Sequence, residues 1–531
     1  MGNAGTSEHV LTIDLGTSGP KVAIFTVDGV FVDGDSERTA LRLLPDGGAE
    51  QSPSDWWRAI TTASRRLLER GGAPVDSFAA VAVTAQWSGT VAIGRDGEPL
   101  HDAIIWMDSR GARDVRRLVG GRVRVQGYDP LKLRRWIALT GGVPALSGKD
   151  PVGHISWLRR EHPEVARATW KYLEPKDWLN HRLTGRACAT HDSIVLHWVT
   201  DNRDAAHIDY DPGLLRLAGL DRAQLPDLAP ATAIVGELTA PAAEALGLRP
   251  GVPVVGGTPD VQSAAIGSGA VRDYEGHLYV GTSSWLTCHV PFKKTDLVRG
   301  IASLPSPLPG RYYVADEQES AGACIEWLRD NVFYAQDAIG RDTSMPDDVY
   351  RRIDDTAATA PPGAGGVIFT PWLNGERTPV DDHRLRGGWH NVSLATTRAD
   401  LVRAVLEGVG YNTRWLLGAV EKFVDRRFPA LNFVGGGAQS DLWCQVLADV
   451  LDRPIRQVAH PVHANTRGAA LLAGVALKRL TVDDVARSVT VTKTFAPDPS
   501  VRATYTEMYR AFRDLHKRTR TIYARLNSHG R

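Results

Sequence analysis

Two glycine-containing turns, far apart in the chain, have the composition of phosphate-binding loops. The first is Gly16-Thr17-Ser18 and the second is Gly281-Thr282-Ser283. Each follows an apolar, β-branched run and precedes another, which predicts a strand, a tight turn and a second strand at both places. Successive backbone N–H groups in such a turn form a concavity that binds anions, and the hydroxyls add further donors. Together the turns predict a clamp on the phosphates of one nucleotide.

Two aspartates follow predicted strands at positions that suit this chemistry. Asp14 ends the strand before the first turn, where a carboxylate can hold Mg²⁺ beside the phosphates. No Gly-Lys-Ser/Thr enters a helix there, so the turn is not a Walker loop, and a plain hairpin turn is the alternative.

Asp260 follows the predicted strand at residues 251–257. It could orient an acceptor hydroxyl and take its proton during phosphoryl transfer. Capping a predicted helix at residues 261–266 is its alternative role.

A triple glycine supplies the third part of the pattern. Gly435-Gly436-Gly437 separates a predicted strand at residues 431–434 from a predicted helix at residues 441–451. Three glycines after a buried strand let a flat ring such as adenine lie against bare backbone, although a flexible loop would have the same composition. In combination with both turns and Asp260, the segment predicts ATP-dependent transfer of a phosphoryl group to a hydroxyl.

The acceptor pocket is expected where two further strands of the first half end. Gln86, Trp87 and Ser88 follow the strand predicted at residues 79–84, and Trp106 and Asp108 follow the next apolar run. Their polar atoms could bind sugar hydroxyls, and the indole rings could cover apolar C–H faces. Core packing is the alternative for either tryptophan, and a structural ion pair with Arg110 is the alternative for Asp108.

Composition limits the other classes of function. The chain has 531 residues, 43% of them hydrophobic and 23% charged, with a formal net charge of +1. This composition is typical of a globular protein of two domains and gives no reason to expect a nucleic-acid or membrane-surface partner. The four cysteines form no close pair, so neither a zinc site nor a disulfide framework is expected. Residues 1–9 lack a signal-peptide core, and no apolar run reaches membrane-spanning length, which predicts a cytoplasmic protein.

The order of predicted elements indicates an α/β protein. Strands and helices alternate in two successive halves, with a largely helical stretch at residues 114–183 and connecting structure at residues 203–230. We expect domains at residues 9–255 and 256–490, followed by a helical extension at residues 491–531. The extension is basic, and its apolar residues recur at roughly helical spacing, so a docked helix is predicted. Those residues are Tyr505, Met508, Phe512, Leu515, Ile522 and Leu526.

From residue 9 to residue 477 the sequence resembles the FGGY family of carbohydrate kinases, within the sugar kinase/actin-like ATPase superfamily. The motifs occur in the family's order, and they include Asp14-Leu15-Gly16-Thr17-Ser18, Glu50-Gln51-Ser52-Pro53, Ile105-Trp106-Met107-Asp108, Pro175-Lys176-Asp177-Trp178, Glu376-Arg377-Thr378-Pro379 and the triple glycine. The resemblance implies two ribonuclease-H-like domains with the active site in the cleft between them, and a homodimer is plausible by analogy. It also implies that Asp260 is the catalytic base and Asp14 the acid associated with Mg²⁺. Nucleotide contacts are implied at Gly16, Thr17, Ser18, Gly281, Thr282, Ser283, Gly322, Gly436, Gly437 and Asp441.

The acceptor pocket departs from the pattern of the pentulose kinases in this family. Those enzymes usually have Gln-Met-His-Gly where this chain has Gln86-Trp87-Ser88-Gly89, and Asn where it has Val261. Both changes remove hydrogen-bonding groups that would discriminate among hydroxyl patterns, and neither affects the phosphate turns. Because the chain looks most like the pentulose kinases, D-xylulose, phosphorylated to D-xylulose 5-phosphate, is still the first expected acceptor, and these changes are the reason to keep others open. Another ketose or a polyol is the alternative, and a non-catalytic nucleotide-binding regulator is a more remote one.

Overall fold

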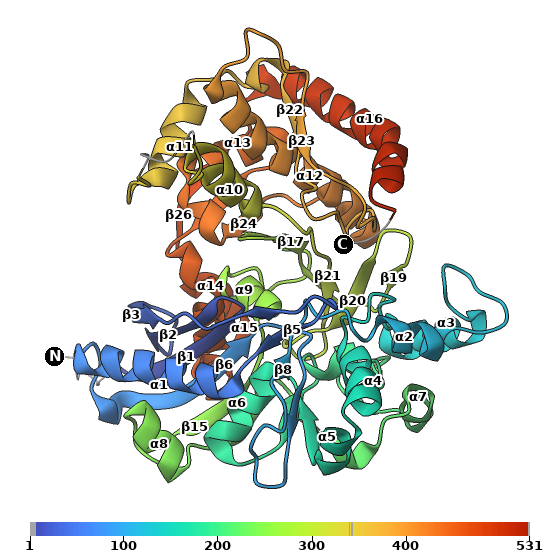
Figure 1. Ribbon diagram of the computed structural model, residues 1–531. Coiled ribbons are helices and arrows are strands. Elements are labelled where there is room, and N and C mark those ends of the chain that lie inside the picture. Colours follow the sequence, from blue (N-terminus) through green and yellow to red (C-terminus); the bar gives the residue numbers. More distant parts are fainter. Residues whose placement is uncertain (1–6, 339, 341–343, 529–531) are drawn as a thin grey trace.

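The computed structural model describes residues 7–338, 340 and 344–528. Residues 1–6, searched above for a signal-peptide core, and residues 529–531 at the end of the basic extension lie outside the described part. The first domain is built on a six-stranded mixed sheet, which Figure 1 shows in the lower half of the molecule. Its strands, in spatial order, are β14 (Ile234–Glu237), β15 (Pro253–Pro259), β6 (Phe78–Ala85), β1 (His9–Gly16), β2 (Gly19–Thr26) and β3 (Phe31–Ser36).

The register of this sheet brings the candidate residues of the first half to one edge. β1 pairs antiparallel with β2, and Gly16 lies opposite Gly19, so the predicted strand, turn and strand are present. β1 also runs parallel to β6, with Asp14 beside Thr84, and β15 runs parallel to β6, with Pro259 beside Ala85. Because parallel strands end at the same edge, Asp14, Gln86 and Asp260 all emerge there.

Helices cover this sheet where the sequence predicts them. α1 (Pro53–Glu69) begins after Ser52, whose hydroxyl accepts a hydrogen bond from the backbone N–H of Asp55. The predicted helical stretch contains α2 to α6, and the segment expected to be only connecting structure also contains a short helix, α7. The bounds are α2 Ala112–Val119, α3 Pro130–Thr140, α4 Pro151–Glu161, α5 Pro163–Ala168, α6 Pro175–Thr184, α7 Pro212–Ala218 and α8 Ala240–Leu246. Short strands among them are β4 Arg42–Leu43, β5 Ala49–Gln51, β7 Val91–Ile93, β8 Ala103–Ile104, β9 Lys171–Leu173, β10 Cys188–Thr190, β11 Thr200–Asp201, β12 Asp209–Tyr210 and β13 Asp227–Ala229.

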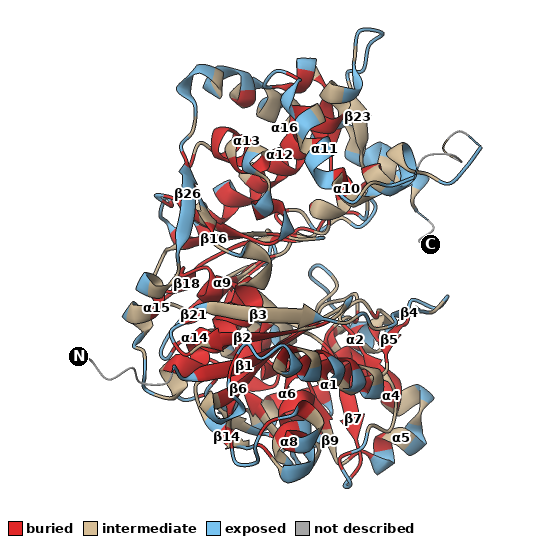
Figure 2. Ribbon diagram, turned by 90° about the vertical axis from the view of Figure 1, so that its left-hand side faces the viewer, coloured by how far each residue is buried: buried red, intermediate tan, exposed pale blue. Residues whose placement is uncertain are grey.

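The second domain is built on a five-stranded sheet in which β16 (Gly276–Val280) is largely buried and the edge strand β26 (Val491–Phe495) is mostly exposed (Figure 2). The spatial order of its strands is β17 (Ser284–Thr287), β16, β24 (Leu431–Val434), β25 (Ile455–Val458) and β26. A smaller sheet contains β18 His289–Val290, β21 Tyr312–Ala315, β20 Ile301–Pro305 and β19 Thr295–Asp296, and a hairpin pairs β22 Ile368–Thr370 with β23 Gly388–His390. The helices are α10 Gly322–Leu328, α11 Val349–Ala358, α12 Arg398–Val424, α13 Asp441–Leu451, α15 Val482–Ser488 and α16 Arg502–Leu526.

The domain boundary expected between residues 255 and 256 is wrong. It falls inside β15, which is paired with β6 in the first sheet. The helix that follows β15, α9 (Asp260–Gly267), packs against α14 (Ala464–Ala476), which also covers β1 and β6 (Figure 1). The two helices touch through glycines, since a Cβ on Gly267 would lie 1.8 Å from the carbonyl oxygen of Ala464. A helix from late in the chain thus completes the first domain.

The C-terminal extension is only partly as predicted. It begins with β26, which joins the second sheet, and so it is not entirely helical. In α16 the side chains of Tyr505 and Phe512 are buried, as a docked helix requires, but Ile522 and Leu526 near its end are 45% and 69% exposed. Of the helices in the described ranges, none combines the length and apolar character needed to cross a bilayer.

Candidate active site

Asp14 is a buried carboxylate with one oxygen unused. It is 2% exposed, and its Oδ2 lies 3.8 Å from the ammonium nitrogen of Lys21 on β2. Burial raises its pKa, while Lys21 and a hydrogen bond from Asn465 on α14 act in the opposite direction. Its Oδ1 is buried and has no hydrogen-bond partner among the described residues. A buried carboxylate oxygen without a partner is the arrangement that a cation would complete.

This environment fits Mg²⁺. Within the described ranges, no group of three or more His, Cys, Asp or Glu side chains is arranged so that it could hold a metal ion. Mg²⁺ does not need such a group, because it is usually held by one or two carboxylates, water and phosphate oxygens. Asp14, at the strand end that leads into the first turn, could supply that carboxylate.

Asp260 is the first residue of α9 and has a strongly perturbed acidity. Its Oδ1 accepts a hydrogen bond of 2.8 Å from the backbone N–H of the next residue, Val261, while Pro259 is the N-cap of the helix. Burial, and then the negative charges of Asp14 and Glu317, raise its pKa to about 8, against the opposing charge of Lys21. A carboxylate with a pKa near the working pH is suited to accept a proton.

The second Gly-Thr-Ser turn lies on the same side as these carboxylates. Tyr279 on β16 covers Gly281, because a Cβ on that glycine would lie 2.7 Å from the tyrosine hydroxyl. The pKa of Tyr279 is raised by burial and then by the negative charges of Asp14 and Asp260. The second turn therefore begins within electrostatic range of the residues that end β1 and β15.

Three glycine segments of the second domain surround the end of β16. A Cβ on Gly322 would lie 2.3 Å from the carbonyl oxygen of Gly281, and one on Gly435 would lie 2.4 Å from that of Val280. A Cβ on Gly437 would lie 2.9 Å from the Val280 side chain, whereas one on Gly436 would meet nothing within 4 Å. Close packing thus requires Gly322, Gly435 and Gly437, while Gly436 leaves open space beside the backbone.

The carboxylate of Asp441, expected to contact nucleotide, contacts other side chains of the second domain. Its carboxylate lies at the start of α13, pairs with the ammonium group of Lys493 at 2.8 Å and accepts a hydrogen bond from Gln457. The side chain is 60% exposed. These contacts join α13 to β25 and β26, so the carboxylate stabilises the second domain in this state.

Of the expected acceptor residues, Gln86 and Trp106 contact the first phosphate turn. The Thr17 hydroxyl donates to Oε1 of Gln86 at 3.2 Å and accepts from the indole N–H of Trp106 at 3.0 Å. Gln86 is buried, while Trp106 is half-buried. The two predicted sites, one for acceptor and one for phosphate, are therefore in direct contact.

The remaining expected acceptor residues use their polar groups within the protein. The indole N–H of Trp87 donates to the carbonyl of Ser193, and the Ser88 hydroxyl donates to the carbonyl of Lys149. Asp108 is 1% exposed and pairs with Arg110 at 2.6 Å, so the ion pair that was the alternative role is present. Val261 offers no side-chain polar atom, and its carbonyl accepts from the hydroxyl of Tyr313.

Sequence reasoning missed a group of charged residues beside the acceptor loop. Arg377 pairs with both Glu317 and Glu319, and its guanidinium lies 5.6 Å from the ring centroid of Trp106. Lys149 is half-buried. Among the described residues, no carboxylate oxygen lies within 4.0 Å of its ammonium nitrogen, the limit for an ion pair. Burial and the charge of Arg377 lower the pKa of Lys149, while Glu317 and Glu319 raise it. The motif around Arg377 was visible in the sequence, but nothing indicated its partners.

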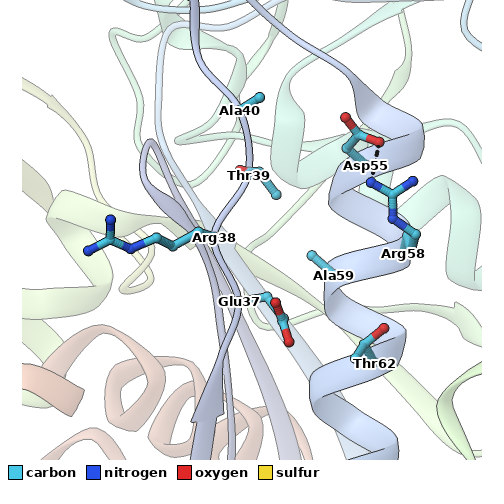
Figure 3. A pocket seen from close by; sticks show the side chains of 8 residues that line it. All are labelled: Glu37, Arg38, Thr39, Ala40, Asp55, Arg58, Ala59 and Thr62. Carbon is cyan, nitrogen blue, oxygen red and sulfur yellow. Dashed lines mark ion pairs between the residues drawn. The ribbon is translucent and has the colours of Figure 1, made fainter.

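A separate pocket lies on the other side of the first turn. It encloses about 260 Å³ between α1 and the segment after β3, and its residues are Glu37, Arg38, Thr39, Ala40, Asp55, Arg58, Ala59 and Thr62 (Figure 3). Arg38 points away from the other labelled side chains, and Asp55 pairs with Arg58. None of the residues expected to bind acceptor or nucleotide lines this pocket, so it is not the candidate active site.

Known proteins resemble the chain over almost its whole length. A xylulose kinase of Staphylococcus epidermidis is 26% identical over 535 residues, covering 98% of both chains. A gluconokinase of Bacillus licheniformis is 23% identical and covers 99% of both. The crystal structure of a ligand-bound xylulose kinase from Lactobacillus acidophilus matches with a TM-score of 0.83 at 22% identity, covering 98% of this chain and 100% of that one, and shows the same fold.

Family models account for most of the sequence. The N-terminal domain of the FGGY family of carbohydrate kinases matches residues 9–267, and the C-terminal domain of that family matches residues 277–477. The first match extends through β15 and α9, in agreement with the sheet topology. The chain belongs to the FGGY family of ATP-dependent carbohydrate kinases.

Proposed function

We propose that this kinase transfers the γ-phosphoryl group of MgATP to a hydroxyl of an open-chain, polyhydroxylated acceptor held beside Asp260. The observation that carries the proposal is the position of Asp260 at the strand edge shared with Asp14, with a pKa raised to about 8. A carboxylate with this pKa is partly ionised near neutral pH and is a stronger base than an ordinary aspartate.

In the proposed reaction, Asp260 orients the acceptor hydroxyl and takes its proton. The hydroxyl oxygen forms its bond to the γ-phosphorus as the bond from that phosphorus to the bridging oxygen of ADP breaks. The backbone N–H groups of the two Gly-Thr-Ser turns hold the phosphates, one turn from each domain. A Cβ on Gly436 would meet nothing within 4 Å, so the backbone at this glycine offers a flat surface for the adenine ring.

Mg²⁺ would be held by Asp14, whose Oδ1 has no partner among the described groups. The cation would neutralise phosphate charge when bound. Lys21 and Asn465 favour the ionised form of this carboxylate and so oppose the effect of its burial, which raises its pKa.

D-xylulose is the first candidate acceptor, since two of the reported relatives are xylulose kinases. D-gluconate is the second, because one relative is a gluconokinase and because Lys149, whose backbone carbonyl accepts from Ser88, carries a half-buried ammonium group in electrostatic range of Arg377. A carboxylate at the far end of the acceptor would offset the cost of burying that charge.

An ADP-release assay tests the proposal directly. Purified protein with MgATP is assayed with D-xylulose, D-gluconate, D-ribulose, erythritol and glycerol, each against a blank without acceptor. Stimulation by at least one acceptor supports a carbohydrate kinase with this site, and the acceptor with the highest kcat/KM identifies its class. Slow hydrolysis that no acceptor stimulates would contradict the proposal and favour a non-catalytic nucleotide-binding protein.

A further inference from the structure

Thr17, in the first phosphate turn, is held by three side chains of the acceptor side. Its hydroxyl proton is donated to Gln86, and its hydroxyl oxygen accepts from the indole of Trp106. Its carbonyl oxygen accepts from Nε2 of Gln51 at 2.8 Å, and Oε1 of Gln51 accepts from Nε2 of Gln86, also at 2.8 Å. Thr17, Gln86 and Gln51 form a closed ring of hydrogen bonds to which Trp106 is attached.

This ring limits the hydrogen bonds that the Thr17 side chain can donate to a phosphate. A threonine hydroxyl has one proton to donate, and here Gln86 receives it. A phosphate oxygen only accepts hydrogen bonds, so it gains nothing from this hydroxyl while the bond to Gln86 persists. The turn then offers its backbone N–H groups and Ser18, but not the Thr17 side chain.

Trp106 connects the ring to the second domain. Its indole N–H points to Thr17, and the guanidinium of Arg377 lies over the ring system at 5.6 Å from its centroid. Arg377 is fixed in turn by Glu317 and Glu319 of the second domain. An acceptor that contacts the half-buried face of Trp106, or a movement of Arg377, therefore displaces an indole that is hydrogen-bonded to the phosphate turn.

We propose that Trp106 is a positioning residue that couples acceptor binding to the phosphate turn through Thr17. When acceptor displaces the indole, the Thr17 hydroxyl loses the donor that helps to fix its orientation, and it becomes free to turn from Gln86 and donate to a phosphate oxygen. Acceptor then tightens MgATP binding, and by reciprocity MgATP tightens acceptor binding by the same factor. This inference rests on the proposed function, because it assumes that acceptor and nucleotide bind at these two sites.

The test is a binding measurement that needs no turnover. Calorimetry gives the Kd of the protein for a magnesium complex of a non-hydrolysable ATP analogue, with and without a saturating acceptor (D-xylulose or D-gluconate, whichever stimulates ADP release). We expect acceptor to lower this Kd by about 10-fold, the size of a typical coupling between sites. The variant W106F, which keeps an aromatic face but has no N–H, is expected to reduce the factor to less than about 3-fold.

Trp87 supplies the matched control. It follows the same strand, but its indole N–H donates to the carbonyl of Ser193 rather than to the turn. W87F is therefore expected to keep the wild-type coupling factor, whatever its effect on acceptor affinity. Q86M, which removes the acceptor of the Thr17 proton, is expected to tighten analogue binding without acceptor and to abolish the coupling.

The outcomes separate the two hypotheses. Equal Kd values with and without acceptor in the wild type, or undiminished coupling in W106F, would overturn the inference while leaving acceptor-stimulated ADP release intact. Failure of every acceptor to stimulate ADP release would instead contradict the proposed function. Thermal unfolding without ligands shows whether W106F and Q86M are folded, and the variant T17S, which keeps the hydroxyl, is expected to retain the coupling.

Discussion

Asp14 lies near the end of β1 and Asp260 directly follows β15, the two strands that flank β6, and the negative charge of Asp14 raises the pKa of Asp260. The two carboxylates come from positions far apart in the sequence, yet the parallel pairing of β1, β6 and β15 brings them to one edge. One of them has a buried oxygen without a partner among the described residues, and the other has a pKa of about 8. This difference in environment assigns them different roles, one beside a cation and one as a base.

The first prediction concerns the pH dependence of turnover. Because Asp260 accepts a proton only when ionised, kcat/KM at limiting MgATP is expected to fall as the pH drops below about 8. Lys21 opposes the rise in this pKa, so K21M is expected to move the acid limb to higher pH. Initial rates between pH 5.5 and 9 measure both. If kcat/KM of the wild type instead falls only near the ordinary pKa of an aspartate, the role of Asp260 is contradicted.

The second prediction is that D260N stabilises the protein while inactivating it. A pKa raised by folding means that the ionised form is disfavoured in the folded state. The cost of ionisation is absent below the unfolded pKa near 3.8 and grows as the pH rises toward about 8. D260N removes that cost, so its Tm is expected to exceed that of the wild type by roughly 2 °C or more at pH 8.

Calorimetric or fluorescence melts at pH 5 and pH 8 provide the check. The excess in Tm is expected to shrink at pH 5, where most of the wild-type Asp260 is protonated. A Tm difference independent of pH would mean that the substitution acts through packing, and a Tm below that of the wild type at pH 8 would contradict the electrostatic account.

Local features of the fold were predictable because they depend on short-range rules. The strand, turn and strand around Gly16 follow from two apolar, β-branched runs joined by a glycine turn, and α1 follows from the capping residues that begin at Ser52. The membership of β15 in the first sheet was not predictable, since it depends on pairing Val254 with Val81, far away in sequence. A boundary drawn from composition alone therefore cut this strand.

The candidate site shows the same limit. The two candidate phosphate turns and both candidate aspartates were proposed from sequence motifs, but the partners of each polar atom could not be predicted. Asp108 was open to two readings, which only its contacts with Arg110 could decide. Lys149 gave no signal, because its importance arises from the approach of Glu317 and Glu319 in the second domain.

The third prediction concerns Lys149. Its backbone carbonyl accepts from Ser88 of the expected acceptor loop, and its ammonium group lies in electrostatic range of Glu317, Glu319 and Arg377. If that ammonium group faces the acceptor, K149M is expected to raise the KM for acceptor by about 10-fold or more. The KM for MgATP is expected to change by less than about 2-fold, since the phosphate turns do not contact this residue. K149R, which keeps the positive charge, is the control and is expected to lose less. Equal effects on both KM values would place Lys149 outside the acceptor pocket.

The fourth prediction contrasts two glycines of the second domain. A Cβ on Gly322 would meet the carbonyl oxygen of Gly281, so G322A is expected to distort the second turn, raise the KM for MgATP by about 10-fold and lower the Tm. A Cβ on Gly436 would meet nothing within 4 Å, so G436A is expected to keep the wild-type Tm. If adenine lies on this backbone, G436A still raises the KM for MgATP. An unchanged KM would remove Gly436 from the nucleotide site.

The most direct test of the account is the acceptor-stimulated rate of ADP release by D260N. The account predicts that kcat falls by about 10³-fold or more, while the Kd for a magnesium complex of a non-hydrolysable ATP analogue stays within about 3-fold of the wild-type value. Wild-type kcat in the folded variant would contradict the claim that Asp260 takes the proton of the acceptor hydroxyl.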